Sequence, residues 1–364
     1  NKDIARHVKA RFCLNEGTHY KYHDELEYAS EAEKWLQMAA TESDKLITSG
    51  RYEIYNTGHP QEDYFNMYRI DDKSDLKEAV LYVDYKTNIR EHNMAAAGRE
   101  AGCGFSKSFV ESFLCSDGLP ISLSNKYLGD ETMRKETANR DPRLKQLILT
   151  NDFPTNVTDD LKDSTFVVNE DEFITQHCFT GYRPIKGFNP IYSQALYMKS
   201  SFDGIAYRYA ETLLINAEAK AELNTITNAD LDRTVNQLRD RVGMPHLTVN
   251  VGFTDPKWPD WGYSLSPVLQ EIRRERCIEL AGEGFRFNDL KRWKAGKLLN
   301  NVLTYVGKRK PDGNLAIVYP NYTNPDLSYQ AGKSRTWEDK MYLYPIPTGE
   351  LQRNPQLLPQ NPGW

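Results

Sequence analysis

The sequence predicts a mainly α-helical protein, in which tetratricopeptide-like helix pairs form a right-handed scaffold and carry a large irregular, loop-rich insertion with short strands. Apolar residues recur at helical spacing in residues 1–50 and 202–300. Between these regions Gly, Pro, Asn and Asp punctuate the chain, and long periodic stretches are few. Helix pairs that flank irregular chain are typical of helical repeats, although no strict repeat of about 34 residues is visible.

The expected layout is one domain over residues 1–364, because a chain of this length can bury a sizeable core. It comprises a helix pair at 1–50, the irregular insertion at 51–201, helical repeats at 202–300 and an extended C-terminal tail at 301–364. Hydrophobic residues make up 39% of the chain and charged residues 27%, with a formal net charge of −5. This balance gives no reason to expect a nucleic-acid partner.

The first helix pair is predicted from apolar stripes. Ile4, Val8 and Phe12 recur at steps of four, as one face of a helix requires. For the second helix we expect Ser30 as the N-cap, with Glu33 three residues later as in a capping box. Its stripe comprises Ala32, Trp35, Leu36, Ala39 and Leu46.

Fewer elements are expected in the insertion. Alternating residues predict a short strand at Ala79–Tyr85, and a helix is expected at Ser106–Phe113. The Pro after Asp141 leads into a short extended run at Leu147–Thr150.

Helix is expected to return at Phe202, and three more helices follow. The first is capped by Thr227 or Asn228 and stops at Gly243. The second begins after Ser266-Pro267, since Pro is favoured in the first turn. It runs to about Gly282, and a shorter helix continues through Trp293.

Several classes of site find no support in the sequence. The five cysteines show no metal-ligand spacing, so we expect no metal and no cofactor. A disulfide between Cys103 and Cys115 is conceivable, but no feature of the sequence supports it. Asp159-Asp160 with Asp163, and Glu170-Asp171-Glu172, could bind calcium through oxygens, but a solvated acidic loop is favoured. No run of about 18 apolar residues is present, so no segment of this chain is expected to span a membrane.

Residues 272–293, IRRERCIELAGEGFRFNDLKRW, place opposite charges three residues apart. A carboxylate cluster could serve acid–base catalysis, or it could form a salt-bridged helix face. We favour the second interpretation because an arginine within one turn lowers the pKa of a carboxyl group, whereas a general acid needs the pKa raised. We therefore expect no catalytic residue. The expected pairs are Arg276 with Glu279, Glu283 with Arg286, and Asp289 with Arg292.

The last residues, 342–364, read YLYPIPTGELQRNPQLLPQNPGW. Their prolines prevent regular helix, so we expect this tail to be held by packing onto the helices. This segment and residues 272–293 together resemble the SusD/RagB family. The matching residues are Arg274, Glu275, Arg276, Glu279, Leu280, Glu283, Gly284, Arg286, Asp289, Leu290, Arg292, Trp293, Leu343–Pro347, Asn354-Pro355 and Gln360–Trp364.

The resemblance implies cell-surface binding of oligosaccharide nutrients and their delivery to a partner TonB-dependent (SusC-like) outer-membrane transporter, without chemistry. It implies a location on the extracellular face of the outer membrane through an N-terminal lipid anchor that this chain lacks. The signal peptide, the lipid-modified cysteine and the first repeats of the family are also missing, so we expect a longer protein. The alternatives are a peptide-binding member of the family and a secreted glycoside hydrolase.

Two sets of residues are candidates for ligand binding, because sugar faces stack on aromatic rings while sugar hydroxyls need polar partners. One set lies in a Pro-rich loop, where the tryptophans could instead plug the helix layer below. The other lies in the insertion. The sets are Trp258, Trp261 and Tyr263, and Tyr64, Tyr68, Arg90, His92 and Asn93.

Overall fold

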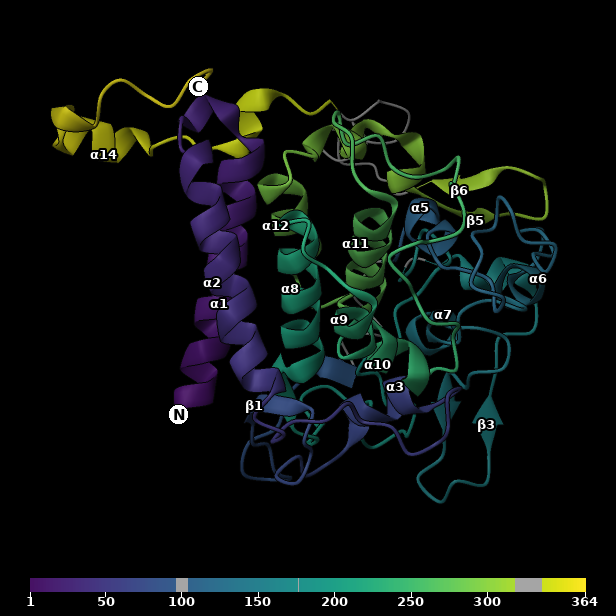
Figure 1. The fold of residues 1–364 in the computed structure, drawn as a ribbon. Helices are drawn as coiled ribbons and strands as arrows, with labels where there is room; N and C mark the ends of the chain where they lie inside the picture. The colour runs from purple at the N-terminus through teal and green to yellow at the C-terminus, as the bar shows by residue number, and fades with distance from the viewer. Residues whose placement is uncertain (96–103, 176, 318–335) are drawn as a thin grey trace.

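The computed structural model of the chain describes residues 1–95, 104–175, 177–317 and 336–364. Long helices stand side by side in one half of the molecule, and irregular chain fills the other half (Figure 1). The helices are α1 (Lys2–Tyr22), α2 (Ala32–Ile47), α3 (Asp63–Asn66), α5 (Lys107–Glu111), α6 (Met133–Thr137), α7 (Arg143–Leu147), α8 (Tyr209–Glu222), α9 (Asn228–Asp232), α10 (Val235–Arg241), α11 (Pro267–Glu279), α12 (Arg286–Arg292) and α14 (Thr348–Arg353). The strands are β1 (Ala79–Val83), β2 (Asn156–Val157), β3 (Ser164–Thr165), β4 (Gly204–Arg208), β5 (Val306–Arg309) and β6 (Leu315–Ile317).

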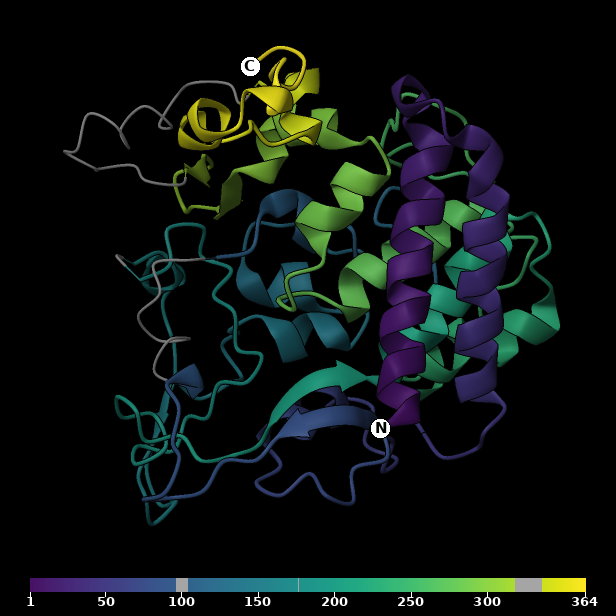
Figure 2. The same cartoon turned by 90° about the vertical axis from the view of Figure 1, so that its left-hand side faces the viewer.

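The helical scaffold is built around α8. All of its residues except Lys220 are buried, because α1, α2, α10 and α11 pack around it. Helices α1 and α2 lie side by side (Figure 2), and Gly17 allows their close approach, since a Cβ there would lie 2.8 Å from Cγ of Leu36. The predicted mainly α, tetratricopeptide-like architecture is confirmed. Among the described residues, no helix combines the length and apolar character needed to cross a bilayer.

Two helix starts differ from the prediction. Helix α2 begins at Ala32 after a 3₁₀ turn at Ala29–Glu31, and its N-cap position is Glu31, so the capping role predicted for Ser30 is wrong. Helix also does not return at Phe202, because residues 204–208 form β4 and α8 starts only at Tyr209. Local periodicity missed β4 because its partner, β1, is distant in the sequence.

Strands β1 and β4 form an antiparallel two-stranded sheet, in which Tyr82 faces Ile205. The predicted strand at Ala79–Tyr85 is confirmed, although it ends at Val83. Thr227 caps α9 through a capping box with Asp230. Of the two residues predicted for this cap, Thr227 and Asn228, the first is therefore correct. The predicted continuous helix after this cap is instead divided into α9 and α10.

A buried ion network joins the scaffold to the insertion. Arg208 of β4 and Arg143 of α7 both pair with Glu279 at the end of α11, and all three side chains are at most 1% exposed. These chain-distant ion pairs position the segment after α11, which forms part of the candidate site described below. The network consists of Arg143, Lys186, Arg208, Arg239 and Arg241 with Glu78, Asp141, Glu275, Glu279 and Glu283.

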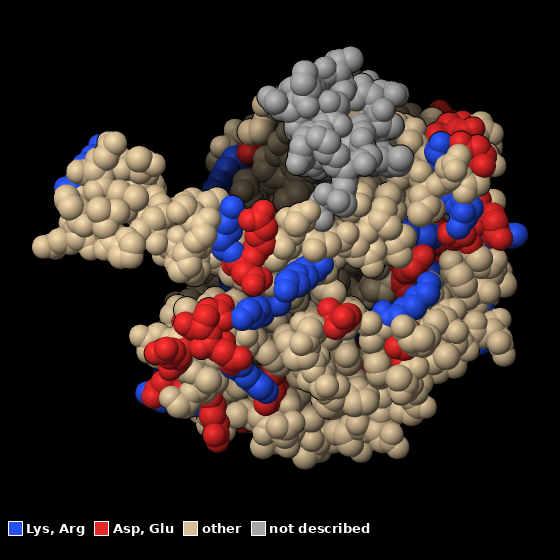
Figure 3. All heavy atoms as spheres, turned by 90° about the horizontal axis from the view of Figure 1, so that it is seen from above, with Lys and Arg blue, Asp and Glu red and all other residues tan. Residues whose placement is uncertain are grey.

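The tail follows the prediction that it packs onto the helices only at its start. Tyr342 is buried and its hydroxyl accepts from the Gly296 amide, and the Tyr344 ring lies 4.1 Å from Lys291 Nζ of α12. Helix α14 contains no buried residue and projects from the body as an arm (Figures 1 and 3). The two ends of the tail also hold each other. Gln360 exchanges hydrogen bonds with the backbone of Ile346, and the Trp364 indole donates to the carbonyls of Lys340 and Leu343.

Candidate functional site

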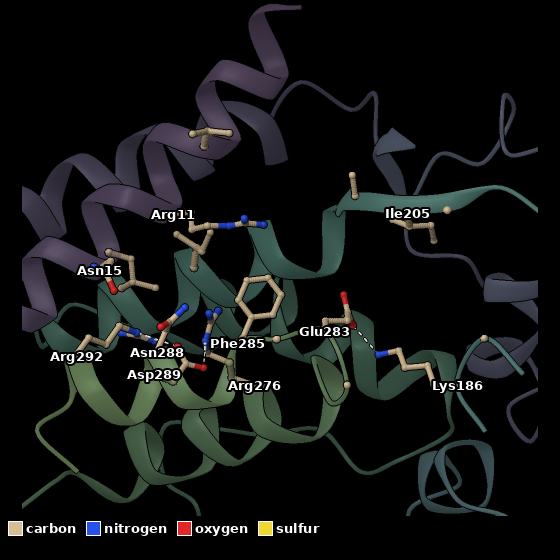
Figure 4. Close-up of a pocket in the computed structure, with 18 of the residues that line it drawn as sticks. Arg11, Asn15, Lys186, Ile205, Arg276, Glu283, Phe285, Asn288, Asp289 and Arg292 are labelled. Atoms are coloured by element: carbon tan, nitrogen blue, oxygen red, sulfur yellow. Dashed lines mark hydrogen bonds and ion pairs between the residues drawn. The ribbon is translucent and has the colours of Figure 1, made fainter. Parts of the chain in front are cut away.

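A pocket of about 1070 Å³ opens between α1, β4 and the segment that joins α11 to α12. Figure 4 shows Arg11 and Asn15 projecting from α1, with Phe285 and Asn288 on the opposite wall. Ile205 of β4 lies at one side of the pocket in the same view. The pocket therefore combines apolar rings with charged and amide groups, as ligand pockets in proteins commonly do.

Two glycines shape the wall after α11. Gly282 and Gly284 have φ angles of 75° and 84°, which side chains with a Cβ rarely adopt. The chain therefore turns sharply on both sides of Glu283, and Phe285 follows directly at the start of α12. Both Glu283 and Phe285 line the pocket.

Glu283 is tied to cations from two other elements. It accepts hydrogen bonds from Lys186 Nζ at 2.6 Å and Arg208 Nη2 at 2.6 Å. Burial alone would raise the pKa of Glu283, but the charges of Arg208 and Lys186 hold it below its usual value. Burial also lowers the pKa of Lys186 to about 8. Glu283 is therefore a carboxylate whose charge is already neutralised.

The predicted pairs within residues 272–293 are correct in one case and wrong in two. Asp289 pairs with Arg292 at 2.9 Å as expected. Glu279 and Glu283 instead pair with residues of the buried ion network outside this segment, because the helix face is buried rather than exposed. Burial would raise the pKa of Glu279, but the charges of Arg241, Arg208 and Arg143 lower it below its usual value. The sequence interpretation that these carboxyl groups are held ionised is thus confirmed, with different partners.

Loops of the insertion form the edge of the pocket. Met94 and Phe202 line it, and the His92 imidazole shares a hydrogen bond of 2.8 Å with the Phe202 carbonyl. His92 also forms a β-bridge with Ser200, and Asn93 Oδ1 accepts from the Met198 amide at 3.1 Å. The structure therefore places the predicted residues His92 and Asn93 beside residues 192–200.

Two tyrosines of the loop at residues 192–200 are exposed. Tyr197 is 76% exposed and Tyr192 is 50% exposed. We call Tyr192, Tyr197 and Asn93 the tyrosine platform. The predicted Arg90 is exposed nearby in the chain, and its guanidinium lies 4.9 Å from the centre of the Tyr85 ring.

The two predicted tyrosines of α3 and the turn after it are placed differently. Tyr64 is fully buried in the apolar core, and its hydroxyl donates to the Glu279 carbonyl at 2.6 Å. Tyr68 is half-buried, lines the pocket and donates to Glu283 Oε1 at 3.2 Å. Of these two predicted residues, Tyr68 is the one that lines the pocket.

The predicted residues of the Pro-rich loop lie outside this pocket. Trp261 is 5% exposed and packs its ring 5.5 Å from that of Trp293. Trp258 is half-buried and donates from its indole to Glu271 at 2.7 Å. Tyr263 lines a smaller pocket of about 430 Å³, where it stacks on Tyr22 at 4.4 Å. The loop thus packs against the helices, and its indole groups are engaged.

The acidic segments form no cluster of metal ligands. Asp160 pairs with Lys162 at 2.9 Å, and Asp159 accepts from the Ser193 amide. Within the described ranges, no group of three or more His, Cys, Asp or Glu side chains could hold a metal ion. Cys115 is buried with a free thiol, and Cys103 lies outside the described residues.

Sequence reasoning missed Tyr192, Tyr197, Arg11, Phe285 and Asn288. The first two stand in an aromatic-rich stretch between residues 189 and 202, which is a signal similar to the one that singled out Tyr64 and Tyr68. The other three carry no local signal, because α1 and α12 meet only in the folded chain.

Comparison with known proteins identifies the family. A model of the SusD family matches residues 41–364. The chain is 33% identical over 166 residues to the SusD-like protein P2 of Formosa agariphila, a stretch that covers 46% of this chain and 27% of that protein.

Solved structures show the same fold. A SusD-like protein from Bacteroides fragilis superposes with a TM-score of 0.69 at 24% identity, over 100% of this chain and 65% of that one. A SusD-like carbohydrate-binding protein from the same species gives a TM-score of 0.65 at 22% identity, over 98% of this chain and 64% of that one. The chain thus spans less than two thirds of the length of these relatives. Because the family match extends over most of the sequence, the protein belongs to the SusD family.

Proposed function

We propose that the protein binds oligosaccharides at the tyrosine platform and the adjoining edge of the pocket. The observation that carries this proposal is the exposure of Tyr197 and Tyr192 in the loop whose Met198 amide is bonded to Asn93. Aromatic rings offer flat apolar faces to the C–H surfaces of sugars, and polar groups beside them can bind hydroxyls. Met94, next to Asn93, lines the pocket, so one extended ligand can contact both features. The carbohydrate-binding relative in Bacteroides fragilis supports the choice of ligand class.

We further propose that binding occurs without chemistry. Glu283 and Asp289, two carboxylates that line the pocket, are paired with Lys186, Arg208, Arg276 or Arg292. Their pKa values are lowered despite burial, which opposes a role as general acid. Incubating the purified protein with the glycan that it binds should release no shorter product.

The cellular role is proposed from family membership. We propose that the protein acts on the extracellular face of the outer membrane and delivers its ligand to a TonB-dependent transporter. Copurification of such a transporter with the affinity-tagged protein from its own bacterium supports this role. Protection of the protein from proteinase K added to intact cells would contradict the surface location.

The binding site is tested by affinity electrophoresis in gels that contain polysaccharides, followed by calorimetry with the oligosaccharide identified. A Tyr197→Ala and Tyr192→Ala double variant should lose about 1 kcal/mol or more of binding free energy, about fivefold or more in Kd. Tyr28→Ala is the matched control, because Tyr28 is a tyrosine 55% exposed in the turn between α1 and α2. Trp258→Ala tests the alternative site in the Pro-rich loop.

Unchanged retardation of the double variant, together with loss in Trp258→Ala, would move the site to the Pro-rich loop. Retention of peptides but of no glycan would overturn the glycan proposal.

A further inference from the structure

The wall of the pocket near α12 contains an arginine with unused donors. Arg276 is 3% exposed, and its Nε donates to Asp289 at 2.9 Å. Its Nη1 is buried and has no hydrogen-bond partner among the described residues, nor is Nη2 bonded to any of them. A buried guanidinium normally uses most of its five donors, because each unmet donor costs free energy.

Two further polar groups face the same space without full partners. Arg11 bonds to Glu211 through Nε and Nη2, which leaves Nη1 without a bond to the described residues. Asn288 is exposed, and its amide makes no hydrogen bond within the described part of the chain. The ring of Phe285 lies 5.0 Å from the Arg11 guanidinium and 5.3 Å from that of Arg276, so both cations gather around one ring (Figure 4).

The carboxylates that line the pocket already accept hydrogen bonds from protein groups. Asp289 accepts from Arg276 and Arg292, and Glu283 accepts from Arg208 and Lys186. The oxygens of the third carboxylate, Asp203, accept the backbone amides of Lys73 and Tyr85. The lining residues include five cationic side chains and three carboxylates. A ligand that fits this wall must therefore bring acceptors for the open donors. Glu211 and Glu218, which do not line the pocket, neutralise Arg11 and Arg292. The case for an anion therefore rests on the open donors, because anionic oxygens are the strongest acceptors for a guanidinium group.

We propose that Arg276, Arg11 and Asn288 bind the negatively charged substituent of an acidic sugar, either a uronate carboxylate or a sulfate ester. Guanidinium groups bind such planar or multi-oxygen anions through paired, charge-assisted hydrogen bonds. The ring of Phe285 offers an apolar face to the sugar itself. The inference rests on the proposed function for the sugar, and it adds that acidic sugars bind in preference to neutral ones.

The test compares glucuronate and glucose 6-sulfate with glucose in calorimetry or ligand-observed nuclear magnetic resonance. The acidic sugars should bind at least about tenfold more tightly, and the difference should shrink when salt is raised from about 0.05 to about 0.5 M. Preference for glucuronate identifies a carboxylate ligand, and preference for glucose 6-sulfate identifies a sulfate ester.

Exposed position 288 allows the charge to be changed without touching the core. Asn288→Asp should weaken binding of the acidic sugar about tenfold by repulsion, whereas Asn288→Lys should preserve or strengthen it. Arg286→Gln is the control, because Arg286 is exposed on α12 and does not line the pocket. This substitution lowers the net charge by one, as Asn288→Asp does. Arg276→Lys keeps the charge beside Asp289 but loses the guanidinium fork, and it should also weaken binding.

Equal binding of acidic and neutral sugars, unchanged in Asn288→Asp, would overturn the acidic subsite and leave oligosaccharide binding at the tyrosine platform intact. Binding of glucuronate without binding of any oligosaccharide would keep the subsite and overturn the proposed function. An equal loss in Arg286→Gln would assign the effect to overall charge and also overturn the subsite.

Discussion

Replacing Glu279 by glutamine should strongly destabilise the protein. Glu279 is fully buried at the end of α11 and pairs with three arginines from three other elements, Arg143, Arg208 and Arg241. Glutamine has nearly the same shape but no charge, so the variant isolates the electrostatic contribution. Glutamine keeps one oxygen as a hydrogen-bond acceptor. Its NH₂ group is a donor and would face the arginine N–H donors that bonded to the second carboxylate oxygen.

The magnitude follows from the balance of the buried ion network. The network contains five cations and five carboxylates, and the side chain of each member is at most 20% exposed. Glu279→Gln leaves one buried positive charge without a counterion. Removing one partner of a buried pair costs about 3–5 kcal/mol, which is a large part of the stability of a typical domain.

Urea denaturation followed by circular dichroism measures this loss. Glu31→Gln is the control, because the Glu31–Lys34 pair is exposed and should contribute less than about 1 kcal/mol. The double variant Arg241→Met, Glu279→Met restores the charge balance and should lose less than the two single replacements together. A change within about 1 kcal/mol of the control in Glu279→Gln would refute the reasoning that the network is stabilised by mutual neutralisation.

Two further predictions concern stability. Burial would raise the pKa of Glu211, but its bonds to His7 and Arg11 lower it from 4.5 to about 2. The stability it contributes is therefore fully present above pH 4.5 and is lost as the pH falls toward 2. Glu211→Gln should lower the free energy of unfolding by on the order of 3 kcal/mol at neutral pH. Denaturation curves recorded at successively lower pH should show this loss becoming smaller. A loss that stays constant with pH would contradict the lowered pKa of Glu211. Gly307→Ala should lower the thermal midpoint, at a cost of about 2 kcal/mol from overpacking, because its Cβ would lie 2.0 Å from the Thr180 carbonyl oxygen; an unchanged midpoint in calorimetry would show that the strand can move aside.

The fold was predictable from sequence where local signals decide it. The cap at Thr227, the Ser266-Pro267 helix start and the apolar stripe of α2 are signals carried by neighbouring residues. The stripe predicted for α1 identified the helix but not its buried face, because Val8 and Phe12 are exposed. Strand β4 was missed because its structure depends on pairing with β1. The projecting part of the tail, α14, was misjudged because its packing depends on distant contacts.

Candidate binding residues were harder to predict than helices. Tyr64 and Trp261 carry the aromatic character of a sugar platform, but the fold buries both. Composition cannot separate a buried ring from an exposed one, because both positions favour aromatic residues. Similarly, the charges of residues 272–293 were correctly expected to be paired, yet the partners of Glu279 come from β4, α7 and α10. Which arginine faces which carboxylate is decided by tertiary packing.

The contact between His92 and Phe202 has a consequence for the order of folding. These residues are 110 positions apart in the sequence, and the bond between them joins the two loops that carry the tyrosine platform. Closing so long a loop costs chain entropy before any contact compensates for it, so such contacts form late. Helices α1 and α2, which are adjacent in the chain, can pair first. The platform should therefore be among the last surfaces to assemble and among the first to open in hydrogen exchange.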